Sequence, residues 1–173
     1  MRGTAESNGR MAECPERPVT APATPSLEHA FTIRAEIDRP RSAGPGPMGE
    51  RLHIPITGGT VSGPKLNGTI LPGGSDWPVI GPDGHSRVEA HYTIETDDGT
   101  LIYVVNKALR VSSAEVTARL RAGEKVSPAE YYMRGAPVFD APDGPHAWLR
   151  DSLFICSLSP AGQTITIDVY AVR

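Results

Sequence analysis

The segment VEAHYTIET, residues 88–96, alternates apolar and polar side chains from Val88 to Glu95. Alternation with period two places the apolar side chains on one face of a strand and the polar ones on the other. It predicts a strand with one buried face. Asp97-Asp98-Gly99 follows directly. An Asp-Gly pair tolerates the positive φ of a primed turn, so we expect a hairpin whose return strand covers residues 101–106.

The rest of the chain repeats this pattern in short segments separated by Gly and Pro. Further strands are predicted at residues 27–38, 51–56, 66–71, 131–134, 153–158 and 164–172, with a short piece around Val61. One helix is expected, because Ser112-Ser113-Ala114-Glu115 has the pattern of a capping box led by Ser112, and Gly123 is a typical helix end. These elements predict an all-β fold, a small closed antiparallel β-barrel of about eight strands with one short helix, since closure leaves no sheet edge exposed.

The chain divides into a tail and one domain. Residues 1–25 are rich in Pro, Ala, Thr, Glu and Arg, and such a segment cannot bury enough apolar surface to offset the entropy lost on ordering. We therefore expect a disordered N-terminal tail over residues 1–25, with a partner-binding arm as the alternative. Residues 26–173 form the predicted barrel domain.

The composition argues against several classes of function. The 173 residues carry 17 basic and 20 acidic side chains, for a net charge of −3, whereas a nucleic-acid binder needs a basic stripe. No apolar run reaches the roughly 18 residues of a membrane-spanning helix. Cys14 and Cys156 make a poor disulfide framework, and residues 1–6 lack the apolar region of a secretory signal. We expect a cytoplasmic protein, and a homo-oligomer is compatible with the sequence.

Several motifs resemble a known family. They cover residues 52–170 and include the following: Ile54-Pro55-Ile56, Gly63-Pro64-Lys65-Leu66-Asn67-Gly68, Leu71-Pro72-Gly73-Gly74-Ser75-Asp76-Trp77, Tyr131-Tyr132-Met133-Arg134 and Ala147-Trp148-Leu149. In this order they resemble a bacterial and fungal family known as domain of unknown function 3237 (DUF3237). The resemblance implies a compact β-barrel of this length and no established activity.

The first candidate site is the Gly-rich segment that contains Asp76 and Trp77. A Gly-rich loop lets the backbone approach a ligand closely, and Asp76 there could act as an acid or a base. Trp77 offers a flat apolar wall with one N–H donor. The alternative is structural, with Asp76 capping local amides in a turn and Trp77 closing a barrel end.

Glu89 and His91 form the second candidate site. They point to the same side of one strand, and a carboxylate and an imidazole that shared the barrel lumen would shift each other's pKa values. The alternative, that this face is solvated, is favoured because polar side chains usually face outward. Tyr103, on the return strand, is a candidate ligand contact.

Asn106, Arg134 and Trp148 complete the candidates. Asn106, at the predicted end of its strand, can both donate and accept, and Arg134 could bind a carboxylate or stabilise an enolate. The alternatives are an ion pair at the barrel rim for Arg134 and a place in the core for Trp148. We expect Asp76, Asn106 and Arg134 to converge at one mouth of the barrel.

Metals and other cofactors are not expected. The five histidines lack metal-binding spacing, and the chain has no Gly-x-Gly-x-x-Gly or Gly-x-Ser-x-Gly motif. A barrel of about eight strands can hold one small ligand or be filled by side chains. The sequence therefore favours a cofactor-free acid–base enzyme, of the isomerase, cyclase, hydratase or lyase type, acting on a compact organic substrate. The alternatives are a lipocalin-like binder of a small apolar ligand and a filled barrel that serves as an interaction module.

Overall fold

The computed structural model describes residues 22–173, and these contain eleven strands that belong to one sheet. The strands are β1 (Leu27–Ile37), β2 (Arg41–Gly46), β3 (Gly49–Ser62), β4 (Gly68–Ile70), β5 (Gly74–Asp76), β6 (Val79–Ile80), β7 (Ser86–Thr96), β8 (Leu101–Val111), β9 (Tyr132–Asp140), β10 (Phe154–Ala161) and β11 (Thr164–Val172). The helix α1 (Ala114–Arg121) and the 3-10 turns η1 (Pro128–Glu130) and η2 (Ala147–Leu149) lie in connections.

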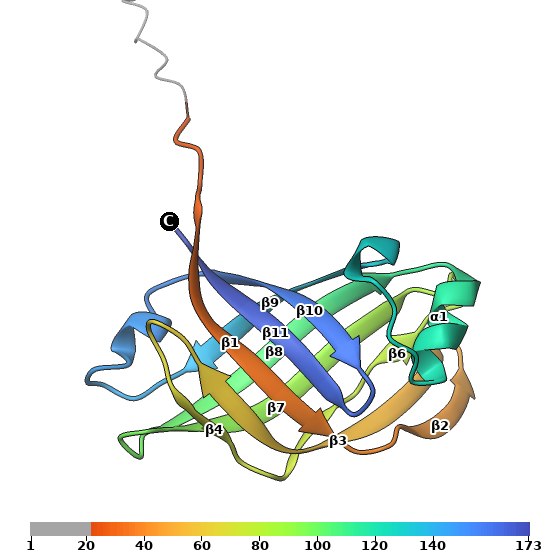
Figure 1. Cartoon of the computed structure of the whole chain (residues 1–173), viewed down its shortest axis with the longest axis horizontal. Helices are drawn as coiled ribbons and strands as arrows, with labels where there is room; N and C mark the ends of the chain where they lie inside the picture. Colours follow the sequence, from red (N-terminus) through yellow and green to blue (C-terminus); the bar gives the residue numbers. More distant parts are fainter. Residues whose placement is uncertain (1–21) are drawn as a thin grey trace, which may run out of the picture.

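The sheet closes on itself as an eight-position antiparallel barrel, which confirms the predicted fold class (Figure 1). From β1 the order runs through β11, β10, β9 and β8 to β7. The short strands β4, β5 and β6 then share one position between β7 and β3. Strand β3 closes the barrel by pairing with β1, while β2 forms a hairpin with the start of β3.

The position shared by β4, β5 and β6 is broken by prolines. Leu71-Pro72-Gly73 separates β4 from β5, and Trp77-Pro78 separates β5 from β6. Proline has no amide hydrogen to donate to a ladder and is therefore found at strand ends and breaks. The breaks explain why the sequence predicted only one strand, at residues 66–71, in this region.

The hairpin between β7 and β8 forms as predicted, but its turn is of another type. Gly99 has a φ of +81°, whereas no residue other than glycine has a positive φ in the described part of the chain. A primed type I turn would need positive φ at two central residues. Instead, the Asp98 carboxylate stabilises the turn by accepting hydrogen bonds from the Thr96 hydroxyl, the Thr100 amide and His146 Nε2.

Helix α1 begins one residue later than predicted. Ser113, not Ser112, is the N-cap, and its hydroxyl accepts a hydrogen bond of 3.2 Å from the Val116 amide. The Ser112 hydroxyl is instead paired with that of Thr117 at 2.8 Å. A complete capping box occurs at η1, between Ser127 and Glu130. Helix α1 ends before Gly123, whose φ is +79°.

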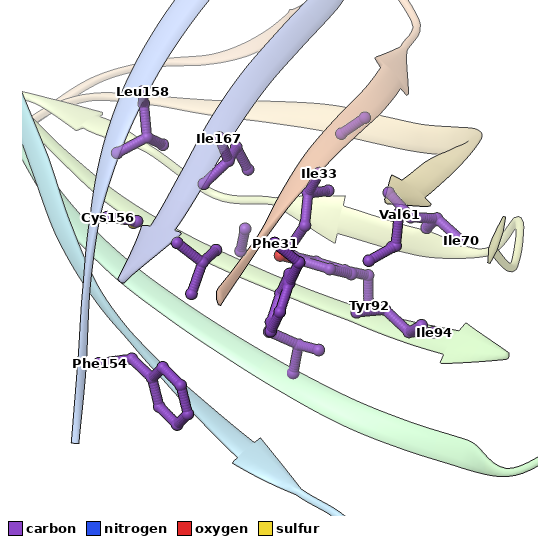
Figure 2. Packing of buried hydrophobic residues seen from close by; sticks show 14 of the residues in the cluster. Phe31, Ile33, Val61, Ile70, Tyr92, Ile94, Phe154, Cys156, Leu158 and Ile167 are labelled. Atoms are coloured by element: carbon purple, nitrogen blue, oxygen red, sulfur yellow. The ribbon is translucent and has the colours of Figure 1, made fainter. Parts of the chain in front are cut away.

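The two ends of the barrel differ. At the end that holds the chain termini, four aromatic rings pack edge to face: Phe31 on Phe139 at 5.6 Å, Phe139 on Phe154 at 5.0 Å, and Phe154 on Trp148 at 5.7 Å. Figure 2 shows Phe31 and Phe154 within the buried apolar cluster. The opposite end, where α1 and the β2–β3 hairpin lie, is not filled in this way.

The predicted tail, residues 1–25, lies almost wholly outside the described residues, and Cys14 lies outside them as well. Residues 22–26 precede β1 without regular secondary structure. The backbones of Ser26 and Arg173 exchange two hydrogen bonds, which hold the beginning and end of the barrel together. In the part of the chain that is described, no helix has the length and apolar character needed to cross a membrane.

We predict that Gly99→Val lowers the free energy of unfolding by about 1 kcal/mol or more, because a β-branched residue resists positive φ. A Cβ at Gly99 would meet no atom within 4 Å, so the cost would be conformational rather than steric. Urea denaturation measures it. Gly46→Val, at an exposed glycine without positive φ, is the control, and equal stability of the two variants would contradict the prediction.

Candidate functional site

A cavity of about 610 Å³ occupies the open end of the barrel, between α1, the β2–β3 hairpin and the β10–β11 turn. Its walls are largely apolar and include Ile37, Leu52, Ile54, Val88 and Ile165. Its polar lining includes Glu50, Asp76, Ser86, Arg110 and Arg121. A concave apolar space with a few polar groups is the usual form of a small-molecule site.

Asp76 lies at the deep end of this cavity. It pairs with Ile54 on one side and Ala90 on the other, and both of these side chains are buried. The Asp76 side chain is only 6% exposed, and its Oδ1 atom is buried without a hydrogen-bond partner. The sequence predicted Asp76 on a loop; the structure places it at the end of a short strand, pointing inward.

The glycine that begins this strand, Gly74, explains how Asp76 reaches the interior. A Cβ on Gly74 would lie 2.7 Å from the Tyr92 Cβ and 2.7 Å from the His91 carbonyl oxygen. Only a residue without a side chain lets β5 approach β7 this closely. Ser75 then faces outward, where its hydroxyl lies 2.9 Å from His53 Nε2, and Asp76 faces inward.

Burial changes the acidity of Asp76. Loss of hydration raises its pKa from 3.8 to about 6, and backbone groups of Glu89 and Trp77 oppose this only in part. A carboxyl group with this pKa exchanges protons readily near neutral pH. Of the candidates that the sequence named, Asp76 is the one that lines the cavity.

Tyr92 adds a second unpartnered polar atom to the interior. Its side chain projects into the core (Figure 2), and its buried hydroxyl oxygen has no hydrogen-bond partner. Burial raises the pKa of this phenol, and the nearby Cys156 and Asp76 add to the effect. The phenol therefore stays protonated and can act as a hydrogen-bond donor in the barrel interior.

Asn106 is buried inside the barrel but is not part of the cavity lining. It is 1% exposed, and its Oδ1 atom accepts a weak hydrogen bond from the Cys156 thiol at 3.7 Å. Burial raises the pKa of this thiol to about 11. The prediction that Asn106 ends its strand is wrong, because β8 continues to Val111.

The longer β8 carries a cavity residue that the sequence analysis missed. Asn106, Ala108 and Arg110 follow one another on the inward face, and Arg110 lines the cavity. The sequence does indicate this position, because the alternation that buries Ile102 and Val104 places Arg110 on the same inward face if the strand continues. An arginine was not expected on an inward face, since charged residues are rarely buried without a partner.

Glu89, His91 and Tyr103 lie on the outer surface of the barrel. His91 Nδ1 is 2.6 Å from the Tyr103 hydroxyl oxygen, and His91 Nε2 is 3.2 Å from a Glu89 oxygen. The opposite, inward face of β7 carries the buried Val88, Ala90, Tyr92 and Ile94. The solvated-face alternative thus describes these positions, and none of the three residues lines the cavity.

The expected convergence of Asp76, Asn106 and Arg134 at one mouth of the barrel is wrong, because Asp76 lies at the deep end of the cavity, Asn106 does not line it, and Arg134 faces outward. Its guanidinium lies outside the barrel wall, over the ring of Tyr132 at 5.5 Å, and donates to the Met133 carbonyl. The cause is the strand period, because the inward positions of β9 are held by Met133 and Gly135.

The two tryptophans also lie away from the cavity. Trp77 is 43% exposed and stacks on His53 with ring centroids 4.2 Å apart. Trp148 packs against Phe154 at the filled end, and Lys65 Nζ lies 5.8 Å from its ring centroid. In residues 22–173 no group of three His, Cys, Asp or Glu side chains is placed to hold a metal ion.

Comparison with known proteins identifies relatives for almost the whole domain. The family model described as "Protein of unknown function (DUF3237)" matches residues 25–172. A UPF0311 protein of Rhodopseudomonas palustris is 40% identical over 151 residues, which cover 86% of this chain and 99% of that protein. The crystal structure of the R. palustris protein of unknown function RPA1785 has a TM-score of 0.85 at 37% identity, covering 88% of this chain and all of that one.

A more distant relative has a named activity. The hydroalkoxylation enzyme phnH of Penicillium herquei is 33% identical over 93 residues, which cover 50% of this chain and 58% of that protein. The crystal structure of an enzyme from the same fungus has a TM-score of 0.65 at 22% identity, covering 89% of this chain and 98% of that one. This second likeness shows the shared fold.

We predict that Asp76→Asn changes the pH dependence of stability. Because the folded-state pKa is raised, the favourable contribution of Asp76 is complete below pH 3.8 and is lost as the pH rises through about 6. As the pH rises from about 4 to 7.5, the free energy of unfolding of the variant should therefore increase by on the order of 2–3 kcal/mol relative to that of the parent. Denaturant titrations at several pH values measure the difference.

Asp98→Asn is the matched control. Hydrogen bonds from Thr96, Thr100 and His146 hold the pKa of Asp98 below its usual value. The effect of pH is therefore opposite: the stability of the parent increases relative to that of Asp98→Asn as the pH rises through the acid range. A pH-independent difference between the parent and Asp76→Asn would show that Asp76 titrates normally.

Proposed function

We propose that this chain, which belongs to the DUF3237 family, is a cofactor-free acid–base enzyme that transfers protons on a compact organic substrate. The observation that carries the proposal is Asp76, a buried carboxyl group with one unpartnered oxygen at the deep end of a cavity. Such a group costs folding free energy when it is ionised, and residues with strongly shifted pKa values in a cleft are typical of catalytic sites.

The named activity of the fungal relative agrees with this chemistry. Hydroalkoxylation adds an O–H group across a carbon–carbon double bond. The alcohol oxygen must lose its proton, and one alkene carbon must gain a proton. One carboxyl group that exchanges protons near neutral pH can serve both steps. We therefore take intramolecular hydroalkoxylation of a hydroxylated alkene as the leading reaction type.

In this reaction Asp76 both accepts and returns the transferred proton. The Asp76 carboxylate accepts the proton of a substrate hydroxyl while the hydroxyl oxygen forms a bond to the β-carbon of an activated double bond. The π electrons move to the carbonyl oxygen that activates the alkene, giving an enolate. The Asp76 carboxylic acid then returns its proton to the α-carbon, the carbonyl is restored and the carboxylate is regenerated.

The apolar cavity walls also support the alternative, a binder without turnover. Ile37, Leu52, Ile54, Val88 and Ile165 would hold an apolar ligand. A binder of this kind gains nothing from a buried carboxyl group, because an apolar residue at position 76 would fill the space without the cost of desolvation. Asp76 therefore favours the enzyme.

We predict that the protein accelerates cyclisation of a hydroxychalcone to a flavanone, an intramolecular hydroalkoxylation of an activated alkene. The enzymatic product should be enriched in one enantiomer, whereas spontaneous cyclisation gives a racemate. Asp76→Asn should lower the enzymatic rate by about 100-fold or more, and below about pH 6 the base form should be lost. Chiral chromatography of the product and a pH–rate profile measure both effects.

Glu89→Gln serves as the control, since Glu89 is an exposed carboxylate on the outer wall. It should keep the parental rate. Saturable binding of the chalcone without turnover would favour the binder, and a racemic product at the spontaneous rate with no binding would count against any use of this substrate class.

A further inference from the structure

Arg110 is a charged group inside the cavity without an acidic partner. It extends from the inward face of β8, it is half-buried, and its Nε atom is shielded from solvent with no hydrogen-bond partner. It takes part in none of the ion pairs found among residues 22–173. An unpaired guanidinium in such a place is costly to the fold.

The neighbours of Arg110 do not neutralise its charge. Arg121, a second guanidinium of the cavity lining, is already held by Glu50 at 2.7 Å, and its positive charge adds to burial in lowering the pKa of Arg110. Tyr131 acts in the opposite direction. However, burial raises the pKa of the Tyr131 phenol, so this group is neutral at ordinary pH.

Asp76 is too deep in the barrel to pair with Arg110. Ser86 pairs with Arg110, and Ala90 pairs with both Asn106 and Asp76. Asp76 therefore lies level with Asn106, four residues along β8 from Arg110. Four residues of a strand span roughly 13 Å. The cavity thus has a cationic group near its mouth and a carboxyl group at its floor, with space between them.

We propose that Arg110 binds an oxyanion of the ligand, a carboxylate or phenolate, at the mouth of the cavity. The planar guanidinium fork matches two oxygen atoms of a carboxylate or one delocalised oxyanion. The ligand would lie along the apolar walls, with its anionic end at Arg110 and its other end at Asp76. The placement of the ligand's other end at Asp76 rests on the proposed function, whereas the anion site at Arg110 does not.

The test compares naphthoate with naphthamide, which has the same shape without the charge. Isothermal titration of the parent should show naphthoate binding about 10- to 100-fold more tightly. Arg110→Gln should abolish this preference while still binding both probes weakly, and Arg110→Lys should keep part of it, because the charge remains without the fork. Arg134→Gln, on the outer wall, should behave as the parent.

Asp76→Asn separates this proposal from the proposed function. It should keep or strengthen naphthoate binding, since it removes a negative charge from the same cavity, while turnover of the chalcone is lost. An Arg110-dependent preference without turnover by the parent would uphold the anion site and reject the proposed reaction. Equal affinity of the parent for both probes, or an unchanged preference in folded Arg110→Gln and Arg110→Lys, would overturn the anion site.

Discussion

Closure of the barrel through β3 is the constraint on which the rest of the structure depends. The C-terminal half of β3 pairs with β1 and β4, and its N-terminal half pairs with β5 and β6. The short strands β4, β5 and β6 pair with β7, so that β3 and these strands together join the edges of β1 and β7. Because each strand position of the wall then has a neighbour on both sides, an interruption is tolerated at one position without exposing a long edge. That interrupted position is where Asp76 lies.

Charged groups that are buried without a partner are concentrated at one end, although His146 Nδ1 at the filled end also has no hydrogen-bond partner. The filled end is built from aromatic rings whose burial stabilises the fold. The carboxylate of Asp98, in the β7–β8 turn at this end, accepts hydrogen bonds from Thr100 and His146. The open end holds a carboxyl group with a raised pKa, Asp76, and a guanidinium without an acidic partner, Arg110. Proteins give up stability at binding and catalytic sites and recover it elsewhere. The asymmetry between the two ends is therefore itself an argument that the open end serves a ligand.

Period-two patterning was enough to predict the fold, since most of the wall alternates strictly from strand to strand. It favoured burial of the apolar face of β7 but left open whether Glu89 and His91 face the lumen. It failed at local breaks: the prolines around β5 concealed a strand, and adjacent serines made the start of α1 ambiguous by one residue. The site was harder to predict, because the partners of Asp76 come from the closure of the sheet. Arg134 illustrates this limit. A guanidinium was a reasonable candidate for binding an anion, but the alternation of side chains along β9 places Arg134 on the outer face of the barrel.

Cellular location and oligomeric state leave no comparable local signature, and they remain predictions. The proposed reaction type, by contrast, rests on two groups of the cavity, Asp76 and Arg110. A deep carboxyl group alone would suit many proton transfers, and a mouth guanidinium alone would suit any anion. Under the proposed function, their separation along the barrel, with apolar walls between, favours an elongated ligand that is anionic at one end and undergoes proton transfer at the other. An activated alkene with an internal hydroxyl group meets this description when it also carries a separate carboxylate or phenolate, because the enolate oxygen lies only two bonds from the carbon that is protonated. On this view Arg110 and Asp76 contribute to one reaction from opposite ends of the same ligand.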